Sequence, residues 1–297
     1  MEILRSLGGL RMPNFHEITN ESNPQSVISK YINAYSEMTG RNVIVYYSGW
    51  LNHTQPKSGS SINDLDKNGF MSVIQGLDKS KGLDLFLHTP GGDVGATESL
   101  IDYLHDSFGG DIRAIIPQIA MSGGTMIACS CKEIIMGKQS SLGPIDPQFS
   151  GIPAEAIIKE FERAKEEVSK HPETTPIWQT MLSKYPPAFV IICENARKLS
   201  DEILEKSLTY SMFDESEKDS IEKIKEVLGS HENTKSHGRH LSAKECSNIG
   251  LKIKNMEDNN EFQDLILSVH HACMDFFNKN EGAIKLLANN QKKFFMQ

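Results

Sequence analysis

The sequence predicts an α/β fold, with a mainly parallel sheet built from β-α-β units and a helical second half. In the first half, short runs rich in Val, Ile, Leu and Phe alternate with segments whose apolar residues recur at helical spacing. Such alternation implies right-handed crossovers, which place the strands parallel in one sheet. In the second half, apolar positions follow helical spacing almost throughout.

The individual elements are expected to follow one another closely. In the first half we expect helices at residues 25–38, 62–77 and 96–108 and a short one after Ser122, with strands at 42–47, 83–88, 112–116 and 133–136. In the second half we expect helices at about 153–169, 188–208, 216–228 and 261–278, a loop at 229–238, and a short strand with a capped helix at 240–251.

The chain is expected to consist of an N-terminal arm and one domain. Residues 1–24 are polar and contain Pro13, Asn20, Asn23 and Pro24, which favour turns over regular structure. Residues 25–297 contain no internal repeat and no linker that would divide them. A chain of this size buries roughly 75% of its extended-chain surface, enough for a large core without disulfide or metal staples.

The charge balance excludes one large class of partner. The 297 residues carry 31 Lys and Arg against 39 Asp and Glu, a formal net charge of -8, with no basic arm or stripe. Nucleic acid is therefore not an expected partner. We also expect no cofactor and no metal.

Cysteine usage and hydropathy indicate a cytoplasmic protein. The five cysteines are odd in number, and only Cys129 and Cys131 are close together, in an apolar run where small buried side chains explain them better than metal ligation. The N-terminus lacks a basic flank followed by a long apolar core, and no segment reaches the ~20 apolar residues of a membrane span.

Two glycine-containing segments lie where a strand hands over to a helix. In the first, 85–93, Gly91 and Gly92 permit a backbone that presents N–H groups outward, and such groups can stabilise a developing oxyanion. A tight turn is the simpler interpretation of this pair. In the second, 116–128, Ser122 opens a helix beside the N–H of Gly123, an environment that suits a nucleophilic serine or an ordinary N-cap. Ala120 excludes the G-x-S-x-G elbow.

Several motifs in a fixed order resemble the serine dehydrogenase proteinase family, a relative of signal peptide peptidase A among the serine peptidases of the Clp protease/crotonase fold. The resemblance covers about residues 42–272. The motifs are His88-Thr-Pro-Gly-Gly92, Ala120-Met-Ser-Gly-Gly124, EIIMGKQSSLGPIDPQ at 133–148, Ile152-Pro-Ala-Glu-Ala-Ile-Ile-Lys159 and SHGRHLSAKECSNIGL at 236–251. The resemblance implies that Ser122 is the nucleophile. It also implies an oxyanion hole made by Gly91 and Gly123, with Gly92 as a further candidate donor.

The general base stays open at this stage. In Clp proteases a histidine follows the strand after the serine, but residues 143–147 contain none, and the Clp aspartate position falls at Gly238. Relatives of signal peptide peptidase use a Ser-Lys dyad with a neutral, desolvated lysine. Lys159, 37 residues after Ser122, matches that pattern best and Lys165 is second, while an unexpected base is the third alternative.

Other polar residues have both a functional and a structural interpretation. Asp146 could orient the lysine or a substrate amide, or it could simply shape the turn between two prolines. His237 stays a substitute base because it adjoins the triad aspartate position. His240 and the pair at 270–271 lack the frame of a metal site, so structural roles are expected for them.

These expectations lead to a soluble serine peptidase that acts through an acyl-enzyme on a polypeptide substrate. The resemblance implies a homo-oligomer. Because the chain has no G-x-x-x-x-G-K-[ST] loop, an unfolding or activating partner would be a separate protein. Two alternatives remain: a catalytically silent scaffold of the same fold, and a crotonase-type acyl-CoA enzyme.

Overall fold

A seven-stranded sheet forms the centre of the computed structural model, which describes residues 18, 23–52, 59–289, 291 and 293–296. The strands lie in the order β10-β5-β3-β2-β1-β11-β12. All pairs from β10 to β1 are parallel, so the mainly parallel α/β prediction is confirmed. Their bounds are β1 (Asn42–Ser48), β2 (Leu83–His88), β3 (Ile112–Ile116), β5 (Glu133–Met136), β10 (Ile253–Asn255), β11 (Lys285–Ala288) and β12 (Lys293–Met296).

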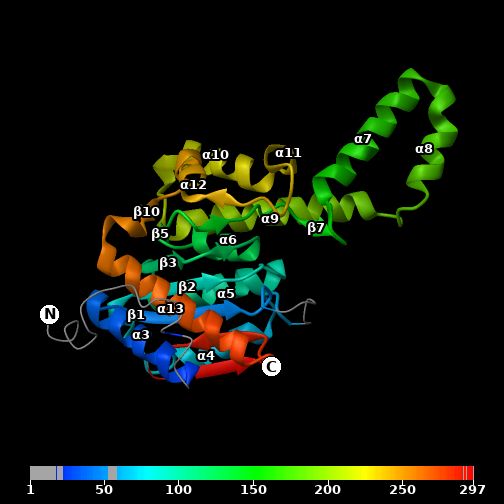
Figure 1. The fold of residues 1–297 in the computed structure, drawn as a ribbon. Coiled ribbons are helices and arrows are strands. Elements are labelled where there is room, and N and C mark those ends of the chain that lie inside the picture. Colours follow the sequence, from blue (N-terminus) through cyan, green and yellow to red (C-terminus); the bar gives the residue numbers. More distant parts are fainter. Residues whose placement is uncertain (1–17, 19–22, 53–58, 290, 292, 297) are drawn as a thin grey trace.

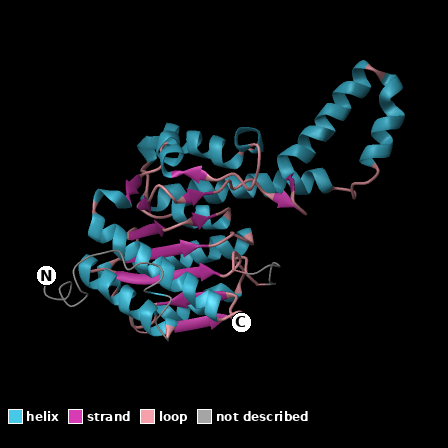
Figure 2. Cartoon of the chain, viewed as in Figure 1, coloured by secondary structure: helices cyan, strands magenta, loops and turns pink. Residues whose placement is uncertain are grey.

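Helices cover both faces of this sheet (Figures 1 and 2). Strand β1 is buried on both sides: Ile44 and Tyr46 pack in one apolar cluster, and Val43, Val45 and Tyr47 pack in the other. The first cluster includes residues of α4, α5, α6 and α9, and the second includes residues of α3 and α13. The helices are α3 (Pro24–Thr39), α4 (Leu65–Ile74), α5 (Val94–Phe108), α6 (Gly123–Cys129), α7 (Ala154–Lys170), α8 (Thr175–Leu182), α9 (Phe189–Ser211), α10 (Lys218–Gly229), α11 (His231–Thr234), α12 (Ala243–Ile249) and α13 (Asn260–Lys279).

Helices α7 and α8 project away from the body of the molecule, and α9 returns the chain to it (Figure 1). We call α7, α8 and the first turns of α9 the projecting arm. A small cluster around Ile157 and Cys193 joins α7 to α9 at its base. The strongly amphipathic pattern expected for 153–169 therefore packs mainly against helices of the arm.

Two minor sheets lie beside the central one. One contains β4 (Ile119–Ala120), β6 (Ser141–Leu142) and β9 (Leu241–Ser242), and the other contains β7 (Gln148–Phe149) and β8 (Ile152–Pro153). Strand β4 ends two residues before Ser122, and β6 ends four residues before Asp146. Because β4 and β6 pair, the two segments leave neighbouring strands.

The expected elements are present within a few residues, and several additional ones were not anticipated. Helix α8 begins within the expected break at 171–176, and α11 lies inside the expected loop at 229–238. The C-terminal residues form β11 and β12, which extend the sheet antiparallel beyond β1. Short strands are set by long-range pairing, which local pattern does not reveal.

Most of the expected N-terminal arm lies outside the described residues. Within it, Ile18 is buried in the apolar cluster under α3 and α13, and Asn23 caps α3 through its side chain. Among the described helices, none has the length and apolar character that a bilayer crossing requires.

Candidate active site

The loop after β2 and the segment after β3 are joined by backbone hydrogen bonds. Thr89 N–H donates to Ile119 O at 3.3 Å, and Met121 N–H donates to Thr89 O at 3.0 Å. This bridge sets residues 89–92 directly beside the turn that contains Ser122. Two segments that the sequence separates by about thirty residues thus form one wall of the site.

Gly91 and Gly92 are required by close contacts. Gly91 has φ 86°, and a Cβ there would lie 2.6 Å from Met121 O. A Cβ on Gly92 would lie 2.3 Å from both N and O of Ile62, because Ile62 forms a parallel bridge with Gly92. Both glycines therefore allow three backbone segments to pack closely. A tight turn alone does not explain the pair.

Two backbone N–H groups beside Ser122, those of Gly92 and Gly123, donate no hydrogen bond within the described part of the chain. The N–H of Gly91, the first expected donor, instead donates to Thr89 Oγ1 at 3.2 Å. The structure therefore favours Gly92 over Gly91 as the partner of Gly123.

Ser122 has φ 50° and ψ -114°, a conformation that a non-glycine residue seldom adopts. It precedes α6, whose seven residues are all buried, and its own side chain is half-buried. The side chain makes no cap hydrogen bond to the helix, so the simple N-cap interpretation fails. A strained turn that exposes a serine is typical of nucleophile positions.

The loop that carries Asp146 is anchored at three points. Thr125 Oγ1 donates to Gly143 O at 2.9 Å, Ile145 N–H donates to Leu228 O at 2.9 Å, and Ser200 Oγ donates to Ile145 O at 3.0 Å. Asp146 itself is almost fully buried and accepts a hydrogen bond from Gln148 at 2.7 Å. This aspartate is held in place and not merely part of an exposed turn.

Two histidines flank the buried Asp146 carboxylate. His237 Nδ1 lies 2.8 Å from Oδ1, and His231 Nδ1 lies 3.4 Å from Oδ2. His237 is about one-third exposed, whereas Nδ1 of His231 is buried without a hydrogen-bond partner. An Asp that holds Nδ1 of a histidine leaves the other ring nitrogen, Nε2, to act on a substrate or a nucleophile.

Ser122, Asp146 and His237 line one cavity of about 530 Å³, together with Gly92 and Gly123. Its remaining wall is largely apolar. The apolar lining residues are Pro90, Val94, Met126, Ile145, Pro147, Phe149, Ala196 and Leu199. Sites with a few convergent polar groups on an apolar wall are typical of enzyme active sites.

Lys159, the first candidate base of the expected Ser-Lys dyad, is not among the residues that line this cavity. Its ammonium group lies 3.0 Å from Glu155 and 2.7 Å from Glu232, and its side chain is 42% exposed. The two carboxylates raise the pKa of Lys159, whereas a lysine base needs a lowered pKa. Lys159 therefore has neither the location nor the electrostatic setting of a base.

The structure assigns Lys159 and Glu155 to the support of α11. Glu155 accepts the backbone N–H of His231 at 2.7 Å and that of Glu232 at 3.4 Å, so it caps the helix that precedes His237. Burial alone would raise the pKa of Glu155, but hydrogen bonds from Lys159 and the His231 N–H lower it overall. The motif at 152–159 thus helps to position the histidine segment.

Lys165, the second expected base, lies in a different cavity. It is exposed and lines a cavity of about 760 Å³ between α7, α8 and α9, on the projecting arm. Ser122 is not among the residues that line that cavity. The structure gives no support to Lys165 as the base.

His237 is only a substitute base in the sequence, because it adjoins Gly238 and its local pattern is that of a loop histidine. His231 carries no local signal of a role beside Asp146. The signal in the sequence is that Asp146 follows the post-serine strand while His237 lies next to the Clp aspartate position at Gly238. Those two residues lie 91 positions apart, and only the folded chain brings them together.

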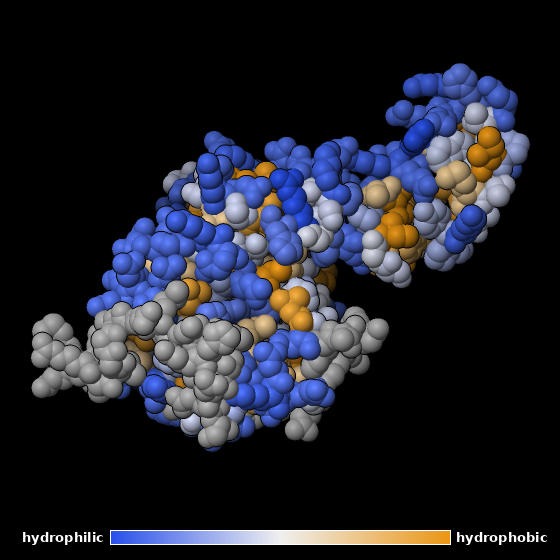
Figure 3. Space-filling view, viewed as in Figure 1, coloured by the Kyte–Doolittle hydropathy of each residue, from blue (hydrophilic) through white to orange (hydrophobic). Residues whose placement is uncertain are grey.

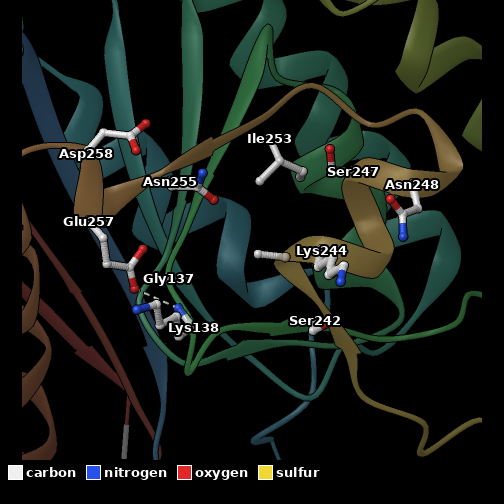
Figure 4. A pocket seen from close by; sticks show the side chains of 11 residues that line it. Gly137, Lys138, Ser242, Lys244, Ser247, Asn248, Ile253, Asn255, Glu257 and Asp258 are labelled. Atoms are coloured by element: carbon white, nitrogen blue, oxygen red, sulfur yellow. Dashed lines mark hydrogen bonds between the residues drawn. The ribbon is translucent and has the colours of Figure 1, made fainter.

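A second cavity of about 530 Å³ lies beside β10 and α12 but lacks this chemistry (Figure 4). Its lining residues include Ser242, Lys138 and Glu257, and no histidine. The Ser242 hydroxyl is engaged with the Glu245 carboxylate at 2.8 Å. Glu257 accepts the Lys138 backbone N–H at 2.8 Å. These hydrogen bonds give both groups structural roles.

The cysteines and the other described histidines have structural surroundings. All five cysteines are free and buried, and burial raises the pKa of Cys129 and Cys131. His88 and His270 are buried beside Tyr47 in the core. Among the described residues, no group of three or more His, Cys, Asp or Glu side chains is arranged to hold a metal ion.

The fold and the glycine-flanked serine define a ClpP-like α/β protein. The model of the ClpP-like SDH-type serine proteinase family matches residues 61–266, more than two thirds of the chain, and the chain belongs to this family. The resemblance in the sequence motifs is thereby confirmed.

Two proteins of Methanocaldococcus jannaschii are similar to the chain, and both are described as uncharacterized. MJ0137 is 40% identical over 98 residues, which are 33% of this chain and 34% of that protein. MJ1495 is 29% identical over 188 residues, which are 63% of this chain and 57% of that protein. The chain thus matches about one third and somewhat over half of the lengths of these relatives.

Proposed function

We propose that this protein is a serine endopeptidase with Ser122 as nucleophile, His237 as general base and Asp146 as the residue that orients His237. The observation that carries the proposal is the 2.8 Å Asp146–His237 pair in the cavity that also contains Ser122. Membership of a ClpP-like serine proteinase family supports the reaction class.

In the proposed reaction, Ser122 Oγ attacks the substrate carbonyl carbon while its proton passes to His237 Nε2. The carbonyl oxygen becomes negatively charged and accepts hydrogen bonds from the N–H groups of Gly92 and Gly123. His237 then donates the proton to the leaving amine, which breaks the peptide bond and leaves an acyl-enzyme. Water, deprotonated by His237, releases the acid and restores Ser122.

Relative to the Clp arrangement, the two supporting residues exchange places. Asp146 occupies the position after the post-serine strand where Clp proteases have the histidine, and His237 adjoins the position of the aspartate. Triads of the same geometry occur in several chain orders, because only the spatial arrangement matters for proton transfer. The exchange accounts for the missing histidine at 143–147.

We also propose that the protein works as a cytoplasmic homo-oligomer on polypeptide substrates. Apolar side chains are exposed on the projecting arm, where Figure 3 shows a hydrophobic surface. They include Ile177 (62% exposed) and Ile191 (58%). Exposed apolar surface of this kind supports association with further copies. Five free cysteines support a reducing compartment.

The decisive experiment compares peptide cleavage by the purified full chain and five variants, with products identified by mass spectrometry. Ser122→Ala and His237→Ala should each lose at least about 10³-fold in kcat/KM, and Asp146→Asn should lose up to about 10⁴-fold. Lys159→Met and Lys165→Met should stay within about threefold of the wild type, because exposed ion pairs contribute little.

Each contrary result has a definite meaning. Cleavage that persists in Ser122→Ala would reject the nucleophile. Loss of cleavage in both Ser122→Ala and Lys159→Met, with cleavage retained in His237→Ala, would restore the Ser-Lys dyad. If the wild type neither cleaves peptides nor reacts with a fluorophosphonate at Ser122, the scaffold alternative replaces the peptidase.

A further inference from the structure

A fully buried lysine from the last part of the chain contacts the segment that is hydrogen-bonded to residues 89–93, which we call the oxyanion loop. Lys285 is the first residue of β11, which pairs with β1 and lies outside the segment that the family model matches. Its exposed fraction is 0%. Burial lowers the pKa of Lys285, and Asp66 opposes that shift. A charge in such a place requires several partners.

Those partners are Asp66 and a backbone carbonyl. Lys285 Nζ lies 2.8 and 2.7 Å from the two carboxylate oxygens of Asp66, and it donates to Ser61 O at 2.7 Å. Asp66, on α4, also accepts hydrogen bonds from the Tyr46 hydroxyl at 3.0 Å and from the Asn63 N–H at 2.9 Å. The ion pair is therefore hydrogen-bonded to the backbone at both Ser61 and Asn63.

The segment 60–63 is held along its length by such contacts. Ser48 Oγ donates to Ser60 O at 2.8 Å, which adds a third anchor next to the two at Ser61 and Asn63. Between these anchors, the backbone N–H and C=O of Ile62 both form hydrogen bonds to the oxyanion loop. Ile62 N–H donates to Gly91 O at 2.7 Å, and Ile62 O accepts from the Asp93 N–H at 2.9 Å.

These contacts form a continuous path from Lys285 to the proposed oxyanion hole. The residue between the two bonds of Ile62 is Gly92, whose N–H is unengaged and whose backbone lies too close to Ile62 to admit a Cβ. A shift of the 60–63 segment would thus turn or displace the Gly92 amide. Misplacement of a catalytic donor by about 1 Å costs on the order of 10²-fold in rate.

We propose that Lys285 is a positioning residue for catalysis: with Asp66, it fixes the 60–63 segment so that the Gly92 N–H points at the oxyanion. This inference rests on the proposed peptidase function and goes beyond it, because it makes the C-terminal strand β11 part of the catalytic support. The family segment alone, residues 61–266, would lack this anchor.

The test uses Lys285→Met and the double variant Lys285→Met/Asp66→Asn, which leaves no unpaired buried charge if the single variant fails to fold. Arg113→Met is the matched control, because Arg113 also pairs with a buried carboxylate, Asp84, at a site that does not touch the 60–63 segment. For each protein one measures kcat, KM, affinity for a peptide boronic acid, and amide hydrogen exchange of residues 59–66 and 88–95.

We expect kcat of the Lys285 variants to fall about 10- to 100-fold with KM changed less than about threefold, and boronic acid affinity to fall in parallel. Exchange in both segments should accelerate, whereas the Arg113 variant should keep kcat even if its thermal midpoint drops. Wild-type kcat and unchanged exchange in a folded Lys285 variant, or an equal loss of kcat in the control, would overturn the inference. If the wild type shows no Ser122-dependent hydrolysis, the proposed function fails, and the exchange measurement still decides the role of Lys285.

Discussion

At the scale of residues, the site depends on two backbone positions that tolerate little change. Ser122 adopts φ 50°, and Gly92 packs against the backbone of Ile62 with no room for a side chain. Strain of this kind is maintained only where surrounding contacts over-determine the conformation. The bridges from Thr89 to residues 119 and 121 supply such contacts.

Replacement of Gly92 by alanine tests the assignment of this residue as an oxyanion donor. The new Cβ would lie 2.3 Å from Ile62 N and O, so the loop must move and the N–H must turn away. We expect kcat to fall about 10²-fold, the typical loss for one oxyanion donor, in steady-state hydrolysis assays. Gly282→Ala is the control, since its Cβ would meet no atom within 4 Å. Full activity of Gly92→Ala would remove Gly92 from the oxyanion hole.

At the scale of elements, the second half of the chain divides its helices between two tasks. Helices α9 and α10 contribute to the main apolar cluster, whereas α7 and α8 extend beyond the body as the projecting arm. On the arm, Ile177 and Ile191 are more than half exposed, and Met181 and Ile192 are exposed as well. Exposed apolar side chains of this kind support the proposal that the arm contacts another copy of the chain.

The double variant Ile177→Asp/Ile191→Asp tests whether the arm mediates assembly. Both side chains are more than half exposed in the single chain, so the variant should fold normally. In an assembly each aspartate would be buried without a partner, which costs several kcal/mol. We expect analytical ultracentrifugation to show a smaller species than the wild type, whereas the exposed control Lys170→Asp keeps the wild-type mass. An unchanged mass in the double variant would exclude these arm positions from the interface.

At the scale of the whole molecule, two buried histidines, His88 and His270, lie beside Tyr47 of the second apolar cluster. His88 ends β2 and stacks on Tyr47 at 5.1 Å between ring centroids. Its Nδ1 lies 3.2 Å from Ser48 O, and its Nε2 lies 3.0 Å from the Gln118 carboxamide. Burial lowers the pKa of His88 from 6.5 to about 4, and it lowers the pKa of His270 as well. Burial therefore disfavours the protonated form of both imidazoles in the folded protein.

This pKa shift predicts that the protein loses stability on acidification. Between about pH 6.5 and pH 4 the unfolded chain binds the His88 proton and the folded chain does not, so the free energy of unfolding falls as pH falls. His88 alone accounts for about 3 kcal/mol over this window. Urea unfolding should give a lower free energy of unfolding at pH 4.5 than at pH 7. The variant His88→Gln should show a smaller difference between the two pH values. The control is His171→Gln, because His171 is exposed; this variant should keep the wild-type difference in the free energy of unfolding between the two pH values. If His88→Gln keeps the full wild-type difference, His88 is not the cause of the pH dependence of stability.

Much of the fold could be predicted because its signals are local. Apolar runs such as 83–88 and stripes such as that of α7 determine the type and approximate position of an element through their periodicity. The glycine pairs beside Thr89 and Ser122 likewise restrict the backbone where they stand. By itself the sequence determined the parallel α/β arrangement, the turn that presents Ser122 and the family.

Only the tertiary structure shows which distant side chains meet in and behind the candidate site. His237 meets Asp146, and Lys285 meets Asp66, across separations of 91 and 219 residues. No local pattern encodes such meetings, because they depend on how α11 and β11 pack against distant segments. Lys159 illustrates the converse: its sequence position fits a base, but in the folded protein Glu155 and Glu232 hold its ammonium group as a structural cation. Periodicity specifies elements, whereas the protonation and partners of a side chain depend on the charges and burial that packing creates around it.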